Sequence, residues 1–387
     1  MKYDVIIVGA GFAGATLANK FAEDKKKVLI IDKRKHIGGN MYEETRKNGV
    51  RVHLYGPHIF HTNDKGVVEY LKKFTNFYFY EHRVLANIKN TLVPVPFNFK
   101  SIELLFDGKK AESIKEKLLK KYKGEKKVSI LELINDKDKE IKKFGEFVFE
   151  NIFVHYTAKQ WNTSIENVDK SVINRVPVLL GYDDRYFQDT YQFMPKNGYN
   201  EIFENMLKSK NITKRLGVDA KEVLEVDIKN KKVLFEGKEF KGKVIYTGEI
   251  DELLNYQYGP LPYRSLKLKF EDKKENYHQP VSVINYTVSE DYTRITEFKY
   301  LSNQTVPNKT TILKEYPLTY DYKNKKHIPY YAILNEENLA LYDKYAKEIK
   351  KIKNIYLCGR LAEYKYYNMD AVVRRALDLY ETIKRSK

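Results

Sequence analysis

The sequence has a single cysteine, Cys358, among 387 residues. One cysteine excludes an intramolecular disulfide and leaves no cysteine cluster for a zinc or iron–sulfur site. Glycine and proline are also scarce, with 19 and 11 residues, below the average usage of roughly 12% for the two together. This low content excludes collagen-like and disordered classes. Because the chain has a single cysteine, we expect a reducing compartment.

Long apolar runs are missing as well. The longest stretches, such as residues 5–10 and 28–31, are far shorter than the roughly 18 residues of a membrane-spanning helix. The chain begins with a short apolar run and a glycine-rich turn, which lack the apolar core and cleavage site of a signal peptide. We expect no membrane partner and a cytoplasmic location.

Charge is the one extreme of the composition. Seventy Lys and Arg residues against 52 Asp and Glu residues give a formal net charge of +18. Such an excess suits nucleic acid, a phospholipid surface or phosphorylated small molecules. Lysines alternate with acidic residues in 109–127 and 136–143, so a lysine-rich solvated surface is the simpler explanation. We find no nucleic-acid-binding motif, and charge alone assigns no partner.

The first 32 residues have the pattern of a strand, a turn, a helix and a second strand. Residues 3–8 and 28–31 are short runs rich in Val and Ile, which is typical of parallel strands buried on both faces. Residues 14–21 supply small side chains for a helix that packs on the sheet. We predict a βαβ unit here.

Later segments differ in pattern. Apolar residues at helical spacing in 111–122 predict an amphipathic helix within a helical insertion. Residues 176–200 and 260–335 are rich in Tyr, Phe, Val and Thr, which favours strands. A last strand near 354–358 and the helix that follows it predict a nucleotide-binding domain assembled from separate segments.

The motif Gly9-x-Gly11-x-x-Gly14 follows the first strand and opens the helix. Its glycines permit a tight turn and close approach to a pyrophosphate, whose charge lies at the helix N-terminus. Asp32 ends the second strand, where a carboxylate accepts hydrogen bonds from an adenosine ribose. A second glycine pair, Gly38-Gly39, follows, and no second Gly-x-Gly-x-x-Gly appears. The pattern favours FAD over NAD, with an ordinary glycine turn as the alternative.

Seven short motifs, in order along nearly the whole chain, resemble the UDP-galactopyranose mutase family of bacterial type. Several motifs in sequence are far more specific than any one of them. They are GGN at 38–40, YGPHIFHT at 55–62, YTAKQW at 156–161, DRYF at 184–187, YRSL at 263–266, YTRI at 292–295 and GRLAEYKY at 359–366.

The resemblance implies an isomerase that interconverts UDP-galactopyranose and UDP-galactofuranose, for cell-surface glycan synthesis. In that family N5 of reduced FAD attacks the anomeric carbon as UDP leaves, without net redox change. It also implies a homodimer, and an α/β fold with a Rossmann-like, glutathione-reductase-like FAD-binding domain. We expect that domain in 1–75, 209–255 and 340–387, a helical domain in 100–172, and an antiparallel β-sheet domain in 76–99, 173–208 and 256–339.

The resemblance also assigns site residues. Arg175 and Arg294 hold the departing diphosphate, for which the guanidinium fork is well suited, and His61 lies by the flavin and the sugar. Residues placed at the cofactor are Gly9, Gly11, Phe12, Ala13, Gly14, Asp32, Lys33, Gly39, Asn40, His58, Ile59, Val218, Gly248, Gly359, Arg360, Tyr366, Asn368 and Met369. Residues placed at the nucleotide sugar are Tyr156, Thr157, Trp161, Arg175, Tyr186, Phe187, Asn285, Arg294, Tyr331, Tyr366 and Asn368.

Some positions have a second interpretation. Asn368 stands where the family commonly has aspartate, so a helix N-cap is the alternative to a substrate role. His58 and His61 lie three residues apart, but without a carboxylate or cysteine cluster we expect no metal. Another FAD oxidoreductase, such as an amine oxidase, is the nearest alternative function, and a basic nucleic-acid-binding protein is the more distant one.

Overall fold

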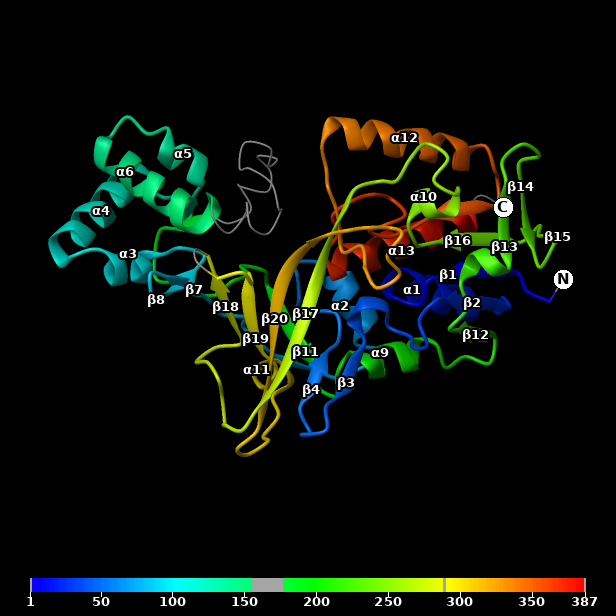
Figure 1. The fold of residues 1–387 in the computed structure, drawn as a ribbon, viewed down its shortest axis with the longest axis horizontal. Helices are drawn as coiled ribbons and strands as arrows, with labels where there is room; N and C mark the ends of the chain where they lie inside the picture. Colours follow the sequence, from blue (N-terminus) through cyan, green and yellow to red (C-terminus); the bar gives the residue numbers. More distant parts are fainter. Residues whose placement is uncertain (1, 155–176, 288–289, 386–387) are drawn as a thin grey trace.

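The computed structural model describes residues 2–154, 177–287 and 290–385, and its centre is a five-stranded parallel sheet (Figure 1). All four neighbouring strand pairs are parallel. In sheet order the strands are β12 (Ile212–Leu216), β2 (Val28–Asp32), β1 (Val5–Val8), β16 (Lys243–Tyr246) and β22 (Ile355–Leu357). The predicted βαβ unit and the last strand therefore meet in one sheet.

Alternation along β1 divides the buried side chains between two cores. Val5 and Ile7 pack into one core, whereas Ile6 and Val8 pack into the other, because successive strand residues point to opposite faces. The first core contains α1 (Phe12–Glu23), α2 (Lys65–Leu71), α9 (Tyr199–Met206) and α13 (Met369–Arg385). The second contains α10 (Ile250–Leu253), α12 (Glu336–Lys350), η4 (Ala220–Glu222), β13 (Leu224–Asp227) and β14 (Lys232–Phe235), which pairs with β15 (Lys238–Glu239).

Helix α9 differs in place from the sequence-based division. Residues 173–208 were expected with the β-sheet domain, but Tyr199 and Phe203 are fully buried in the core that contains α1. The ring of Phe203 lies 4.7 Å from the ring of Phe12. This part of the segment therefore packs with the parallel sheet.

A second, seven-stranded sheet lies between the parallel sheet and the helical insertion (Figure 1). Its strand pairs are antiparallel, as expected, except for the parallel pair β18 and β7. In order the strands are β21 (Tyr331–Ala332), β17 (Tyr263–Lys273), β20 (Thr310–Thr319), β19 (Arg294–Glu297), β18 (Val283–Tyr286), β7 (Val84–Ile88) and β8 (Thr91–Val95). The parallel pair joins strands almost 200 residues apart, which no hairpin connects.

Smaller elements join the two sheets. A three-stranded sheet has the order β5, β11, β6, and β5 also contacts α13. Helix α11 contacts both β4 and β20. The bounds are β5 (Phe60–Thr62), β11 (Tyr191–Pro195), β6 (Phe77–Phe79), η1 (Gly39–Met41), the pair β3 (Glu43–Thr45) and β4 (Arg51–His53), and α11 (Phe298–Ser302).

The helical insertion forms the end of the molecule opposite the two termini (Figure 1). Its helices begin at side-chain caps, Asn98, Asp107, Ser129 and Asp138, each of which accepts a hydrogen bond from a backbone N–H of the first turn. The elements are α3 (Phe99–Leu105), α4 (Gly108–Lys121), β9 (Lys127–Val128) paired with β10 (Val178–Leu179), α5 (Ile130–Ile134), α6 (Lys139–Val148) and the π-helix η2 (Phe149–Val154). No helix within the described ranges is long and apolar enough to cross a membrane.

Gly14 is required by packing at the start of α1. A Cβ atom at this position would lie 1.9 Å from the carbonyl oxygen of Gly9. Gly9 itself has φ +101°, a conformation that favours glycine. The turn between β1 and α1 therefore excludes other side chains at both positions.

We predict that Gly14→Ala lowers the free energy of unfolding by about 1–3 kcal/mol, because the methyl group must displace backbone. Gly108→Ala is the matched control, since a Cβ there meets no atom within 4 Å, and it should change stability by less than about 1 kcal/mol. Urea unfolding measures both. Equal stability of the two variants would contradict the close approach.

Candidate active site

Glycine-containing loops meet at the carboxyl end of the parallel sheet. A Cβ on Gly39 would lie 3.0 Å from Cα of Gly11, and a Cβ on Gly359 would lie 3.3 Å from Cβ of Ala13. Gly11 is the N-cap of α1 and provides no side-chain cap, so the first N–H groups of the helix are left for an anion. These backbones form a cradle that fits the pyrophosphate of a dinucleotide.

Asp32 connects two of these loops. Its carboxylate accepts hydrogen bonds from the N–H groups of Ala10 and Arg34, both at 2.8 Å, and the residue is 8% exposed. A carboxylate has about four acceptor positions. Two therefore remain for the ribose that the sequence analysis placed here.

Other predicted cofactor residues surround this cradle with different roles. Lys33 lies 3.7 Å from carboxylate oxygens of Glu249 and Glu252, and the Val218 N–H donates to the carbonyl of Asp32. A Cβ atom on Gly248 would lie 2.9 Å from the Tyr246 hydroxyl. The loops that follow β2, β12 and β16 thus share one end of the sheet.

The side chains of three further predicted residues are engaged within the protein. The buried ring of Phe12 packs on Phe203, so its backbone is the part that faces the cradle. The Asn40 side chain accepts a hydrogen bond of 2.9 Å from Arg34, and Ile59 is buried in the adjacent core.

A row of polar residues crosses the seven-stranded sheet. Asn285 is the direct cross-strand partner of Arg294, which is in turn the partner of Glu315. Directly opposed residues point to the same face of a sheet. Strand register therefore places the predicted substrate residues Asn285 and Arg294 side by side, with Glu315 next to them.

Arg294 and Glu315 form an ion pair with a distance of 3.1 Å between Nε and Oε2. Their side chains are 24% and 2% exposed. Burial raises the pKa of Glu315, and Arg294 opposes that rise. The pair holds a guanidinium at a fixed place on the sheet, with part of it exposed to a ligand.

His61 is oriented by two neighbours. Its Nδ1 lies 2.8 Å from an oxygen of Asp189, and its ring stacks on Phe187 at a centroid distance of 3.6 Å and an angle of 11°. Phe187 also contacts the ring of Tyr186. The structure thus brings together three residues that the sequence analysis placed at the flavin or at the nucleotide sugar.

His58 lies close to the cations of the site. Burial holds the pKa of His58 well below its usual value, and His53, Arg360 and Arg294 lower it further. Its Nδ1 is buried and has no hydrogen-bond partner among the residues that the structure describes. A neutral imidazole near Arg360 and Arg294 is suited to a cofactor or substrate contact.

A stack of tyrosine rings and guanidinium groups lies near His58. The rings of Tyr331 and Tyr366 stack at 5.3 Å, and the Arg360 guanidinium lies 4.7 Å from the first and 5.4 Å from the second. Arg264, the cross-strand partner of Tyr331, lies 4.8 Å from its ring. Three predicted residues therefore meet, together with Arg264, which stands within a quoted motif but received no role.

The start of α13 lies against β5. Asp370 accepts a hydrogen bond of 2.6 Å from Thr62, the neighbour of His61, and the Val372 N–H donates to the Asn368 carbonyl. Asn368 and Met369 therefore lie at a helix N-terminus near His61, where the helix dipole supplies about half a positive charge. An anionic group is stabilised at such a position.

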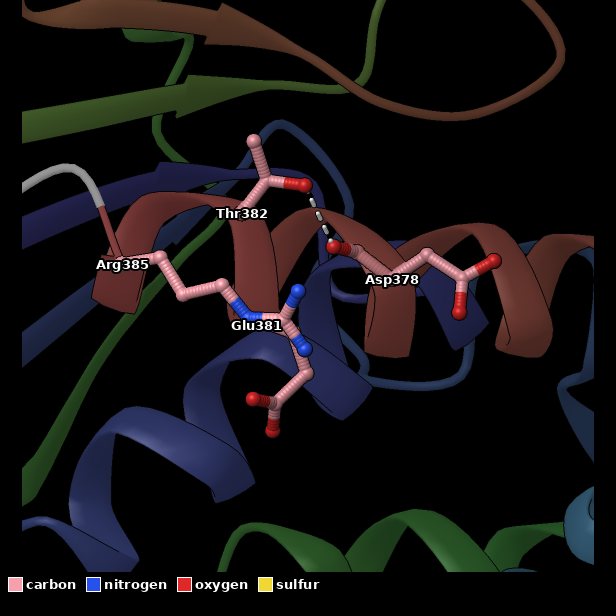
Figure 2. A pocket seen from close by; sticks show the side chains of 4 residues that line it. All are labelled: Asp378, Glu381, Thr382 and Arg385. Atoms are coloured by element: carbon pink, nitrogen blue, oxygen red, sulfur yellow. Dashed lines mark hydrogen bonds between the residues drawn. The ribbon is translucent and has the colours of Figure 1, made fainter.

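Four predicted residues, Tyr156, Thr157, Trp161 and Arg175, lie outside the described residues. Among the residues that are described, no group of His, Cys, Asp and Glu has the arrangement of a metal site. Figure 2 shows a charged surface pocket at the last turns of α13, lined by Asp378, Glu381, Thr382 and Arg385. It lies at the far end of this helix from His61.

The cradle, the imidazoles of His58 and His61 and the arginines are typical of an enzyme in which a dinucleotide cofactor meets an anionic substrate. Residues 7–74 match the family model of the NAD(P)-binding Rossmann-like domain, and residues 151–366, more than half of the chain, match that of UDP-galactopyranose mutase. The chain belongs to the UDP-galactopyranose mutase family, whose members are flavoprotein isomerases. The resemblance, the fold class and the enzyme class expected from the sequence are confirmed.

Relatives match over nearly the whole chain. The dTDP-fucopyranose mutase of Escherichia coli is 35% identical over 97% of this chain and 96% of its own length. The UDP-galactopyranose mutase of Mycoplasma genitalium is 36% identical over 96% of this chain and 92% of its own length. A crystal structure of reduced UDP-galactopyranose mutase aligns with a TM-score of 0.73 at 17% identity, over 100% of this chain and 95% of that one. A structure of putrescine oxidase aligns with a TM-score of 0.56 at 12% identity, over 100% of this chain and 99% of that one. This likeness shows a shared fold.

We predict that Arg294→Met destabilises the protein by about 1–3 kcal/mol, because buried Glu315 then loses the cation paired with it. Adding Glu315→Gln should recover part of this loss, with a coupling energy above about 0.5 kcal/mol in the double-mutant cycle. The control is Arg215→Met, which breaks a more exposed pair with Glu236 and should cost less than about 1 kcal/mol. Additive effects in urea unfolding would contradict the coupling.

We also predict that His82 makes stability depend on pH. Burial, Arg294 and His61 lower the pKa of His82 to about 3, whereas an unfolded histidine titrates near 6.5. Below about pH 6.5 the unfolded chain therefore binds a proton that the native protein does not, and stability falls as pH falls.

Between pH 7 and pH 5 the wild type should lose about 2 kcal/mol more than His82→Phe. Urea unfolding at the two pH values measures the difference. Parallel pH profiles of the two proteins would show that the imidazole of His82 titrates normally.

Proposed function

We propose that this protein interconverts UDP-galactopyranose and UDP-galactofuranose, with reduced FAD as its cofactor and no net redox change. The observation that carries the proposal is the position of Arg294, paired with buried Glu315 and close enough to His58 and His82 to lower their pKa values. A partly exposed guanidinium next to the cofactor loops is what a diphosphate leaving group requires.

The glycine cradle fits FAD. The close approach of Gly11 and Gly39 leaves backbone to face a pyrophosphate, and the start of α13 offers positive charge to an anionic ring. When bound, reduced FAD supplies an electron-rich ring nitrogen, N5, as the nucleophile for the anomeric carbon. This contact with the anomeric carbon requires that the sugar be held beside the ring.

The protein's own groups hold and orient the substrate. Arg294 binds the diphosphate and stabilises its charge as it departs, and Arg175 is proposed as the second guanidinium. His61, aligned by Asp189 and Phe187, contacts the sugar. We place Tyr186, Tyr331 and Tyr366 at the diphosphate, Tyr156 and Thr157 at the uracil, and Trp161 beside the sugar. Asn285 and Asn368 complete the proposed substrate contacts.

The remaining parts of the proposal follow from the resemblance. We place the protein in the cytoplasm as a homodimer that supplies a precursor of cell-surface glycans. The fully buried Cys358 suits a reducing compartment. The amine oxidase alternative is supported by likeness in fold alone.

A second substrate is favoured by one observation. The dTDP-fucopyranose mutase matches this chain as fully as the UDP-galactopyranose mutases do. The same ring interconversion on a dTDP-6-deoxyhexose requires the same arginines. That substrate differs at the methyl group of the base, at the 2′-hydroxyl of the ribose and at the 6-hydroxyl of the hexose.

We predict that protein loaded with FAD and reduced by dithionite converts UDP-galactofuranose to UDP-galactopyranose, and that oxidised protein does not. Arg294→Ala should lower kcat/KM by tenfold to a hundredfold or more, since a charge-assisted hydrogen bond contributes about 1.5–3 kcal/mol. Chromatography of the nucleotide sugars measures conversion, with dTDP-fucose forms assayed in parallel. Reduced, FAD-loaded protein that converts neither pair would disprove the proposal.

A further inference from the structure

The amino end of the five-stranded parallel sheet lies at the opposite end of its strands from the cofactor loops. Its strands begin nearly in register, since Val5 pairs with both Val28 and Lys243. Ile212 pairs with Val28, and β22 begins opposite Val244. Adjacent strands lie about 4.8 Å apart, so the five strand starts form a row about 19 Å long. This row is directed toward the end of the molecule that carries both termini (Figure 1).

Hydrogen bonds join the loops that lead into these strands. Asp4, in the first loop, donates its N–H to the Lys27 carbonyl at 2.8 Å, and its own carbonyl accepts from the Lys243 N–H at 3.0 Å. In the last loop, the Asn354 side chain donates to the Gly242 carbonyl at 2.9 Å. The loop before β12 adjoins the loop before β2, because these two strands are paired. The five loops therefore form one continuous surface, although they come from distant parts of the chain.

Lysine dominates this surface, which we call the basic face. It comprises residues 2–4, 23–27, 208–211, 239–242 and 350–354, with ten lysines, four acidic residues and no arginine. All of the lysines are exposed except for half-buried Lys26. Apart from Lys351, which pairs with Glu348 at 2.8 Å, none of them forms an ion pair with an acidic residue that the structure describes.

Most acidic residues of the basic face are engaged by other groups. Asp24 lies 3.1 Å from Lys384, and Glu23 pairs with Lys20. Both of these partner lysines lie outside the segments of the face. The Asp4 carboxylate accepts a hydrogen bond of 2.7 Å from a backbone N–H. The lysine charge of the face is therefore only partly balanced by its own acidic residues.

Helix ends account for a small part of the remaining charge. Helices α1, α9 and α12 end next to the basic face, and each helix end carries about half a negative charge. Three such ends balance the charge of one or two lysines. Lys2 and Lys241 lead into strands and follow no helix. Stabilisation of helix ends thus leaves most of these lysines unexplained.

A row of lysines without arginine suits a surface of diffuse negative charge. Recognition of nucleic acids relies on the arginine fork and on aromatic side chains that stack on bases. The aromatic residues of the basic face, Tyr3 and Phe240, are buried. The headgroups of anionic phospholipids present negative charge over a broad surface and attract each nearby lysine. The chemistry of the face therefore favours a lipid surface over a nucleic acid.

We propose that the basic face docks the protein on the surface of an anionic phospholipid membrane. The cofactor loops lie at the carboxyl end of the same strands, so docking leaves the proposed active site open to nucleotide sugars in solution. The sequence analysis expected no membrane partner, because it considered spanning segments and total charge. Strand register shows where the lysines gather, and the sequence did not show this.

Sedimentation with phospholipid vesicles tests the proposal on FAD-loaded protein. Vesicles of phosphatidylcholine and phosphatidylglycerol in equal parts should bind the protein, whereas vesicles of phosphatidylcholine alone should not. Binding should be lost on going from 0.1 M to 1 M salt, because the Debye length falls from about 10 Å to about 3 Å. No binding to the anionic vesicles, or equal binding to both kinds of vesicle, would overturn the proposal.

A variant of the basic face measures the part that its lysines play. Lys25→Gln, Lys27→Gln, Lys210→Gln and Lys353→Gln together remove four exposed charges from three of the loops and from the approach to β22. A lysine close to an anionic surface strengthens binding about fivefold, which is equivalent to about 1 kcal/mol. The variant should therefore bind the anionic vesicles at least about tenfold more weakly than the wild type.

The matched control removes four exposed lysine charges from the helical insertion, with Lys109→Gln, Lys123→Gln, Lys137→Gln and Lys143→Gln. The insertion forms the opposite end of the molecule (Figure 1), beyond the reach of screened charge, so binding should stay within about twofold of the wild type. Equal losses in the two variants would assign the effect to net charge and overturn the role of the basic face.

Two further measurements separate this proposal from its alternatives. A short duplex RNA that displaces the wild type from the vesicles, and binds the face variant more weakly, would overturn the membrane as the partner. Isomerisation in solution should be equal in the wild type and both variants, since the substituted lysines lie away from the proposed site. Vesicle binding needs no turnover, so a protein that binds vesicles but does not isomerise would refute the proposed function alone.

Discussion

The pairing of Arg294 with Glu315 across two adjacent strands is the constraint on which the site depends. A carboxylate that is 2% exposed requires a cation, and strand register leaves the guanidinium directly opposite it. The charge of Glu315 and the register of the two strands therefore fix the position of Arg294. Its field lowers the pKa of both His58 and His82. One cross-strand ion pair thus sets the place of the cation, whose charge adds to the burial that lowers the pKa of these imidazoles.

The sequence predicted the Rossmann-like part of the fold well, because that part is built from local patterns. Strand periodicity, the three glycines and Asp32 lie within one βαβ unit, where spacing along the chain determines spacing in the fold. The later strand before Gly359 was recognised by the same pattern. Helix α9 was grouped with the wrong neighbours because its apolar face shows that it packs, without showing on which sheet.

The substrate half depends on contacts between distant segments. Glu315 became visible only through the register of β19 and β20, and Ser282 reaches His82 across 200 residues. Neither residue belongs to a motif, and a buried glutamate or serine in a strand has the same local pattern as any other. Arg264 could have been proposed from the sequence, since it stands in a motif that the sequence analysis quoted. Its stacking on Tyr331, however, depends on the pairing of β17 with β21.

The neutral imidazoles limit the positive charge that the proposed substrate would meet. Positive charge that binds a diphosphate equally well before and during departure lowers the energy of both states, and only a difference between them accelerates the reaction. If His58 and His82 were charged, two more cations would bind the diphosphate firmly in the ground state. Burial and the nearby arginines keep both rings uncharged. Positive charge then stays on the guanidinium groups.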